Sequence, residues 1–184
     1  MNGKNYDFKK FEFGPYANII AAIVESLKAE SYLELGVHKM ETFKLIQPLV
    51  PYAVAVDTDD TYASGYQNFH KSTTDEWFAK NKETFDVIFI DACHDIEFVK
   101  RDFANSLKIL NKRGVIFLHD TDPAEAIFAS INYCHNSYLM NAHLKSNYPH
   151  LNFVTLPTAN SGITIVNNLE DARYKEFTEL KFKL

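Results

Sequence analysis

Four polar side chains follow two apolar runs of the sequence, and their types are those of acid–base and metal chemistry. They are Asp91 and His94 after the run 85–90, and His119 and Asp120 after the run 115–118. Carboxylate oxygens suit Mg²⁺, which prefers hard oxygen ligands, and an unperturbed imidazole takes up a proton near neutral pH. Asp91 and Asp120 are therefore candidate cation ligands, and His94 is a candidate general base.

Each of these residues also has a structural explanation. An acid at the end of a strand often caps the next helix or stays solvated, and Asp95 is placed to cap the helix that it precedes. A lone histidine is more often structural than catalytic. His119 is not a natural Mg²⁺ ligand, so it either softens the site towards Mn²⁺, Fe²⁺ or Zn²⁺ or lies outside the ligand shell.

The elements that must position these residues are a strand, a helix and a second strand. The run 85–90 is short and rich in β-branched and aromatic residues, as in a strand buried on both faces of a parallel sheet. From Asp95 to Leu110, apolar residues recur every three or four positions between charged ones, which predicts an amphipathic helix. Lys112-Arg113-Gly114 is expected to break this helix before the strand 115–118. Both acids should then reach the carboxyl edge of the sheet, where open α/β folds bind ligands.

The rest of the chain alternates in the same way. Helices are predicted from Pro15 to about Leu27, over 39–47, over 76–81 after the cap Ser72–Asp75, and over 123–143. Strands are predicted at 31–35, 52–56, 68–71, 151–156 and 163–166, and the last two form an antiparallel hairpin. Glu34 and Asp57 lie on or after successive strands about 20 residues apart, as in nucleotide-binding units where the second acid binds ribose.

Composition favours one soluble domain over residues 1–184, with an N-terminal arm at 1–14 and a peripheral tail at 168–184. Hydrophobic residues make up 46% of the chain and charged residues 23%, with a net charge of −5, which argues against a nucleic-acid partner. No apolar run is long enough to span a membrane, and the N-terminus lacks the apolar core of a signal peptide. Cys93 and Cys134 fit no metal or redox spacing, so we expect reduced thiols in a cytoplasmic protein, with Cys93 buried.

The acid-x-Gly after the first strand, the acid after the second, and the strand ends FDVIFIDACHD and GVIFLHDTD resemble the class I S-adenosylmethionine-dependent methyltransferases. The resemblance is closest to the small-molecule O-methyltransferases of the macrocin and catechol type. It implies a Rossmann-like α/β three-layer sandwich with a seven-stranded, mostly parallel sheet of order 3-2-1-4-5-7-6 and an antiparallel last strand. It also implies transfer of a methyl group from S-adenosylmethionine to a hydroxyl of a small molecule.

The resemblance assigns roles to individual residues. Glu34, Gly36, Asp57, Ser72 and Asp91 match cofactor-binding positions, with Asp57 at the ribose and Ser72 near the adenine. Asp91 and Asp120 match the ligands of a divalent cation, Mg²⁺ or Mn²⁺, and His94 matches the general base. Small enzymes of this kind are often dimers, so a homodimer is a further expectation.

The sequence departs from the family pattern after Gly36, where glycines are usual and this chain has His38, Met40 and Glu41. Side chains there are expected to crowd the cofactor, and a carboxylate would repel its carboxyl end. This departure keeps open a second function, a methyltransferase-fold protein that has lost catalysis and serves as a binding or assembly module. A nicotinamide-dependent reductase is a weaker alternative, because only Gly36 of its Gly-x-Gly-x-x-Gly fingerprint is present.

Overall fold

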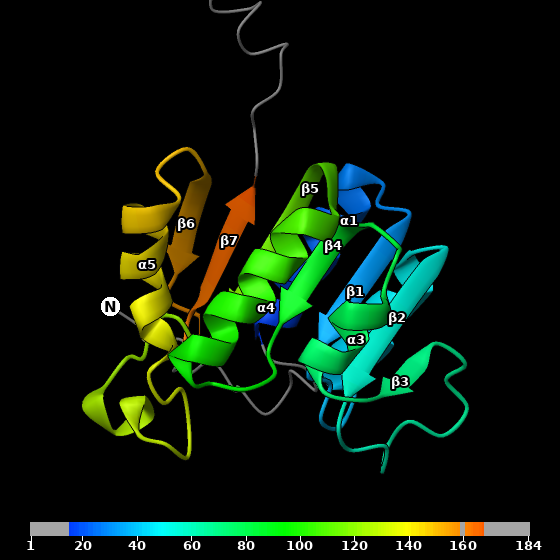
Figure 1. Ribbon diagram of the computed structural model, residues 1–184, viewed down its shortest axis with the longest axis horizontal. Coiled ribbons are helices and arrows are strands. Elements are labelled where there is room, and N and C mark those ends of the chain that lie inside the picture. Colours follow the sequence, from blue (N-terminus) through cyan, green and yellow to red (C-terminus); the bar gives the residue numbers. More distant parts are fainter. Residues whose placement is uncertain (1–14, 159–160, 168–184) are drawn as a thin grey trace, which may run out of the picture.

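A seven-stranded sheet forms the centre of the computed structural model, which describes residues 15–158 and 161–167 (Figure 1). The strands are β1 (Ser31–Leu35), β2 (Tyr52–Asp57), β3 (Phe69–Lys71), β4 (Phe85–Ile90), β5 (Leu110–His119), β6 (Asn152–Leu156) and β7 (Ile163–Asn167). Their order is β3-β2-β1-β4-β5-β7-β6, and β7 runs antiparallel to both of its neighbours. The predicted fold class and strand order are therefore confirmed. The predicted arm 1–14 and tail 168–184 lie outside the described residues.

Helices cover both faces of the sheet. Helices α3 (Thr74–Lys80), α4 (Ile96–Ile109) and α5 (Met140–Asn147) pack on one face, and α1 (Pro15–Leu27) and α2 (Glu41–Ile46) pack on the other (Figure 1). The predicted caps are present: Thr73 forms a capping box with Glu76, and Asp95 accepts a hydrogen bond from the amide of Glu97. No helix in the described part of the chain has the length and hydropathy that crossing a membrane requires.

The register of the central strands brings the site residues together. Leu35 of β1 pairs with Val56 of β2 and with Ile90 of β4, and Ile90 pairs in turn with Leu118 of β5. All three pairs are parallel, so the residues that follow these strands emerge side by side at one edge. The strand register therefore determines which residues lie side by side at the candidate site.

The predicted helix over residues 123–143 is wrong for most of its length. The segment contains the 3-10 turns η3 (Ala126–Ala129) and η4 (Ser137–Leu139), and α-helix begins only at Met140. Ile127 and Ile131, expected on the buried side of that helix, have exposed fractions of 63% and 76%. Polar groups of Tyr133 and Ser137 instead bond to His94 and Asp120, which follow β4 and β5.

The break expected at Lys112-Arg113-Gly114 is also misplaced. Helix α4 ends at Ile109, and β5 begins directly at Leu110, so these three residues lie within a strand. The pairing of β4 with β5 shifts register between Phe85 and Val87, and Arg113 has a φ of 73°. A bulge of this kind inserts residues into a strand without ending it.

Gly36 lies where β1 meets the end of β4, and its lack of a side chain serves packing. Its φ is +80°, and a Cβ atom built there would lie 2.3 Å from the carbonyl oxygen of Asp91 and 2.5 Å from the Cα of Ala92. The sequence suggested that this glycine admits the cofactor. The structure shows a second requirement, because any larger residue would push the end of β4 away from β1.

We predict that Gly36→Ala destabilises the fold by more than about 3 kcal/mol, because the methyl group would overlap the backbone at Asp91. The matched control is Gly65→Ala, since Gly65 has a φ of +88° but nothing within 4 Å of its Cβ position. That variant should lose only the backbone preference, about 1–2 kcal/mol. Urea denaturation of the two variants measures the difference, and equal losses would contradict the packing role.

Asp102 is a buried acid on the inner face of α4. Its exposed fraction is 1%, and its Oδ1 atom has no hydrogen-bond partner among the described residues. Burial raises the pKa of Asp102 to about 6, although the Thr74 hydroxyl opposes the shift. The fold therefore penalises the ionised carboxylate. This cost is absent below about pH 4, the range of an unfolded aspartate, and is complete above the folded pKa.

Asp102→Asn should therefore raise the free energy of unfolding at pH 7 by about 1–3 kcal/mol, given about 1.4 kcal/mol per pKa unit. The gain should shrink as the pH falls from 6 to 4, because wild-type Asp102 then becomes neutral as well. Urea denaturation at pH 7 and pH 4.5 tests this, with Glu97→Gln as the control for an exposed acid on the same helix. A gain that does not depend on pH would rule out ionisation as its cause.

Candidate functional site

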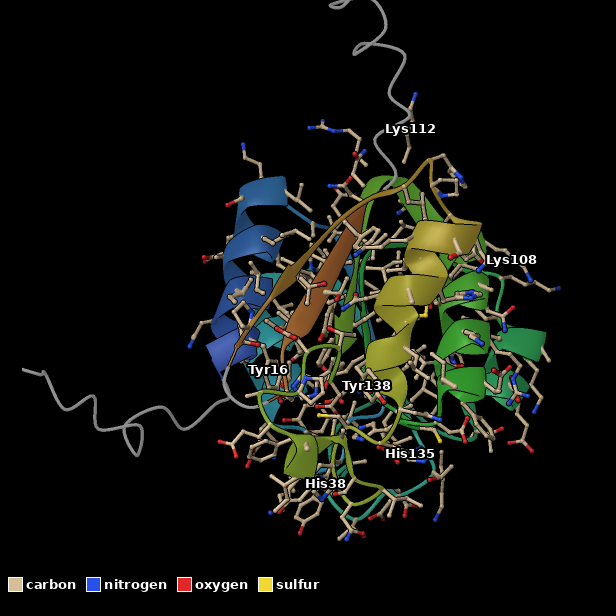
Figure 2. All side chains as sticks on the ribbon, turned by 90° about the vertical axis from the view of Figure 1, so that its left-hand side faces the viewer. Tyr16, His38, Lys108, Lys112, His135 and Tyr138 are labelled. Atoms are coloured by element: carbon tan, nitrogen blue, oxygen red, sulfur yellow. The ribbon has the colours of Figure 1, made fainter. Side chains whose placement is uncertain are left out.

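A single cavity of about 640 Å³ lies at the carboxyl edge of the sheet and touches the ends of five strands. Its lining includes one predicted site residue after or at the end of each strand: Gly36 (β1), Asp57 (β2), Ser72 (β3), Asp91 (β4) and Asp120 (β5). Figure 2 shows Tyr16 and His38 towards this end of the molecule and Lys108 and Lys112 towards the other. Four of the five predicted cofactor residues and both predicted cation ligands thus border one continuous space.

Asp91, His94 and Asp120 form a cluster in the lining of this cavity, which we call the acidic group. One ligand atom from each of the three residues lies within 4.8 Å of the others. The Nε2 atom of His94 is 3.0 Å from Oδ2 of Asp120 and 3.6 Å from Oδ1 of Asp91. The other ring nitrogen, Nδ1, meets the carbonyl oxygen of Tyr133. A carbonyl only accepts hydrogen bonds, so Nδ1 carries a proton and Nε2 is the atom aimed at the carboxylates.

The charges in this group stabilise one another. A hydrogen bond to Asp91 and the charge of Asp120 raise the pKa of His94 to about 9, against the opposing effect of burial. Burial would raise the pKa of Asp91, but His119 and His94 outweigh it and lower that pKa to about 2. At neutral pH the arrangement therefore includes the Asp91 carboxylate beside the His94 imidazolium.

His119 is the second positive partner of the carboxylates. Its Nδ1 atom lies 2.9 Å from Oδ1 of Asp91 and 3.2 Å from Oδ1 of Asp120, and its Nε2 lies 3.1 Å from the Ser161 hydroxyl. Burial lowers the pKa of His119, but Asp91 and Asp120 outweigh it and the net shift is upward. The ring packs against Tyr16 of α1 at a centroid distance of 4.2 Å. The upward shift favours the protonated form of His119, which lies between the carboxylates and α1.

Asp57 organises the loop that follows β1. Its Oδ2 atom accepts hydrogen bonds from the amides of Val37 and His38 at 2.8 and 2.9 Å, and its Oδ1 accepts one from Asp59 at 3.0 Å. Each carboxylate oxygen can accept two hydrogen bonds. Asp57 thus holds the loop in place and keeps one acceptor position for a ligand hydroxyl.

Ser72 and Glu34, also predicted to bind the cofactor, lie in different surroundings. Ser72 lines the cavity, and its hydroxyl has no hydrogen-bond partner among the described residues. Glu34 is 2% exposed and accepts a hydrogen bond from the Tyr32 hydroxyl at 2.6 Å. It borders a separate pocket of about 100 Å³ rather than the main cavity. Burial, together with the charges of Asp91 and Asp57, raises the pKa of Glu34 despite the Tyr32 bond.

The expectation that Met40 crowds the cofactor is wrong. Met40 is fully buried in the core beneath α1 and α2 and does not line the cavity. Its φ is 60°, and that of His38 is 41°, so both residues adopt the left-handed conformation that glycine favours. This backbone turns the Met40 side chain away from the cavity. His38 lines the cavity, and Glu41 lies at the smaller pocket.

Cys93 was expected to be buried, but it is exposed and lines the cavity, whereas Cys134 is buried. Two contacts to Asp120 were not foreseen from the sequence. The thiol of Cys134 donates to Oδ1 of Asp120 at 3.4 Å, and the Ser137 hydroxyl lies 2.6 Å from the carbonyl oxygen of Asp120. Nothing in the spacing pointed to these residues, because their segment was predicted to be helical.

Comparison with solved structures finds the same fold in several methyltransferases. An O-methyltransferase from Bacillus cereus in complex with SAH has a TM-score of 0.66 at 15% identity, covering 85% of this chain and 82% of that chain. TomG, an O-methyltransferase from Streptomyces achromogenes in complex with SAM, has a TM-score of 0.61 at 15% identity, with coverage of 83% and 79%. SAH-bound PaMTH1 from Podospora anserina has a TM-score of 0.62 at 14% identity, with coverage of 82% and 76%.

A search of curated protein sequences finds no match to the chain. A family model described as a methyltransferase domain matches residues 17–121, which is more than half of the sequence. The matched region runs from α1 to the end of β5 and contains every residue predicted for the site. The chain belongs to this family of methyltransferase domains.

Proposed function

We propose that this protein transfers the methyl group of S-adenosylmethionine to a hydroxyl oxygen of a small molecule, with a divalent cation at Asp91 and Asp120. The observation that carries the proposal is the continuous cavity. It joins Gly36, Asp57 and Ser72, on the donor side, to the acidic group at the ends of β4 and β5. Donor and acceptor must share one space because the methyl group passes directly between them.

The residues on the donor side fit the cofactor. A volume of about 640 Å³ is in the range of pockets that enclose cofactors. Asp57 keeps an open acceptor position for a ribose hydroxyl, and the Ser72 hydroxyl is a polar group still without a partner. Both observations favour a ligand that carries hydroxyl and amine groups. S-adenosylmethionine, bound by the solved neighbour TomG, is such a ligand.

The residues on the acceptor side fit a divalent cation. Asp91 and Asp120 offer hard oxygen ligands, and His94 offers a nitrogen in the same group. The hydrogen bond from Nδ1 of His94 to a backbone carbonyl is the arrangement that orients metal-binding histidines. A cation bound here would orient the oxygens of the acceptor and lower the pKa of the hydroxyl to be methylated.

The chain itself would align the reactants and handle the proton. Gly36 and Asp57 fix the cofactor end of the cavity, while Asp91 and Asp120 fix the acceptor end. The Asp91 and Asp120 side chains favour the imidazolium form of His94. Neutralising them would lower its pKa and free the Nε2 lone pair, which could then take the acceptor's proton or serve as a third ligand.

The alternative function, a methyltransferase-fold protein without catalysis, rested on Met40 and Glu41. Met40 is buried in the core, so its side chain leaves the cavity open. Glu41 borders the smaller pocket, where Lys39 is also present. Neither side chain therefore blocks the main cavity, which favours the catalytic function over the alternative.

Isothermal titration with S-adenosylhomocysteine tests the donor side. Wild-type protein should bind it, and Asp57→Ala should bind about 10- to 100-fold more weakly, the cost of losing a hydrogen bond to a charged acceptor. Asp59→Ala is the control, because Asp59 is exposed in the same loop and bonds to Thr61. No heat and no thermal stabilisation of wild-type protein at millimolar ligand would overturn the cofactor assignment.

Mn²⁺ titration, followed by the paramagnetic resonance of the free ion, tests the acceptor side. Asp91→Asn should weaken Mn²⁺ binding at least about tenfold, and EDTA should abolish methyl transfer to dihydroxybenzene acceptors. Asp95→Asn is the matched control, because asparagine also caps helices well and Asp95 is outside the acidic group. Unchanged transfer after EDTA treatment would contradict the requirement for a cation.

A further inference from the structure

Asp120 has a left-handed backbone conformation, which residues other than glycine adopt uncommonly. Its φ is 59°, and its side chain is only 7% exposed. For most residues other than glycine the left-handed region costs about 1–2 kcal/mol, and aspartate is among the few types that enter it more often. A residue in this region persists where its surroundings hold it. The end of β5 therefore needs interactions that keep the Asp120 carboxylate directed into the cavity.

The residues from Tyr133 to Ser137, which we call the site clamp, supply these interactions. The Ser137 hydroxyl lies 2.6 Å from the carbonyl oxygens of both Asp120 and Cys134, which share its single proton. The Cys134 thiol donates to the Asp120 carboxylate. Ser137 and Cys134 are each 1% exposed. One clamp residue thus holds the backbone of Asp120, and another holds its side chain.

The same segment reaches the end of β4 and the start of α4. The Tyr133 carbonyl accepts the hydrogen bond from Nδ1 of His94, and the Asn136 side chain accepts one from the amide of Ile96 at 2.7 Å. Figure 2 shows His135, within the clamp, and nearby Tyr138 at the end of the molecule where Tyr16 and His38 lie. The five-residue clamp therefore contacts His94 and Asp120 of the acidic group and also the start of α4.

A second set of buried hydrogen bonds fixes Thr121, the residue after Asp120. The Asn141 side chain donates to the carbonyl oxygen of Thr121 at 2.9 Å, and the Thr164 hydroxyl lies 2.8 Å from that of Thr121. These bonds fix Thr121 against α5 and β7. Asp120 can then move mainly by rotation about its own backbone dihedral angles. The Ser137 hydroxyl bonds to the carbonyl group that this rotation would move.

We propose that Ser137 is a positioning residue for the acidic group: its hydroxyl holds Asp120 in the left-handed conformation that aims the carboxylate at Asp91 and His94. The inference rests on the cation site of the proposed function, and it assigns that site a supporting residue 17 positions away in sequence. Ser137 acts through Asp120 and touches neither reactant.

The test compares Mn²⁺ and S-adenosylhomocysteine affinities of the full-length protein. Ser137→Ala should weaken Mn²⁺ binding about 10- to 100-fold, the usual effect of losing a group that orients a metal ligand. Affinity for S-adenosylhomocysteine should stay within about twofold, because that end of the cavity lies on β1, β2 and β3. Asn132→Ala is the control, since Asn132 is exposed just before the clamp, and it should change neither affinity.

Ser137→Cys provides a second variant of similar size, with a weaker donor in place of the hydroxyl. It should fall between wild type and Ser137→Ala in Mn²⁺ affinity. A drop in melting temperature with unchanged Mn²⁺ affinity in both variants would assign Ser137 a purely structural role and overturn the inference alone. Absence of Mn²⁺ binding by wild-type protein would instead overturn the cation site itself, and the inference with it.

Discussion

Two carboxylates that lie side by side, one buried and one partly buried, impose the main physical constraint on this protein. Like charges in a low-dielectric site raise each other's pKa unless positive groups compensate them. Here His94 and His119 supply that compensation, so that the pKa of Asp91 is lowered to about 2 despite its burial. The pairing of β4 with β5 sets the spacing of the two acids, and Tyr16 of α1 packs against one of the histidines. Much of the surrounding structure therefore serves to keep this charge group assembled.

Local patterns in the sequence predicted most of the sheet. The runs that became β1 and β4 were located correctly because strands buried on both faces are short and mostly apolar. The acids at or after the ends of β2, β4 and β5 were predicted to lie together because parallel strands bring their carboxyl ends to one edge of the sheet. The strand order did not follow from local patterns and came from the family resemblance, because pairing between distant strands leaves little trace in the sequence.

The errors have a common physical origin in tertiary contacts. Residues 123–139 have apolar spacing typical of a helix, but the Tyr133 carbonyl accepts a hydrogen bond from His94 and the Ser137 hydroxyl donates to Asp120. Met40 was misassigned because its side-chain direction depends on a left-handed backbone that the residue name does not reveal. Cys134 and Ser137 contact Asp120 from 14 and 17 positions away, a separation at which periodicity carries no information.

The loop after β1 affects which sequence patterns can recognise distant relatives of this protein. Gly36, His38 and Met40 have φ values of 80°, 41° and 60°, so the backbone takes the shape that glycine favours at all three positions with a single glycine. The hydrogen bonds that the Asp57 carboxylate accepts from the amides of Val37 and His38 help to hold this shape. A search pattern that demands glycine at each position would reject this chain. A pattern that pairs one glycine with an acid at the end of the next strand would retain it.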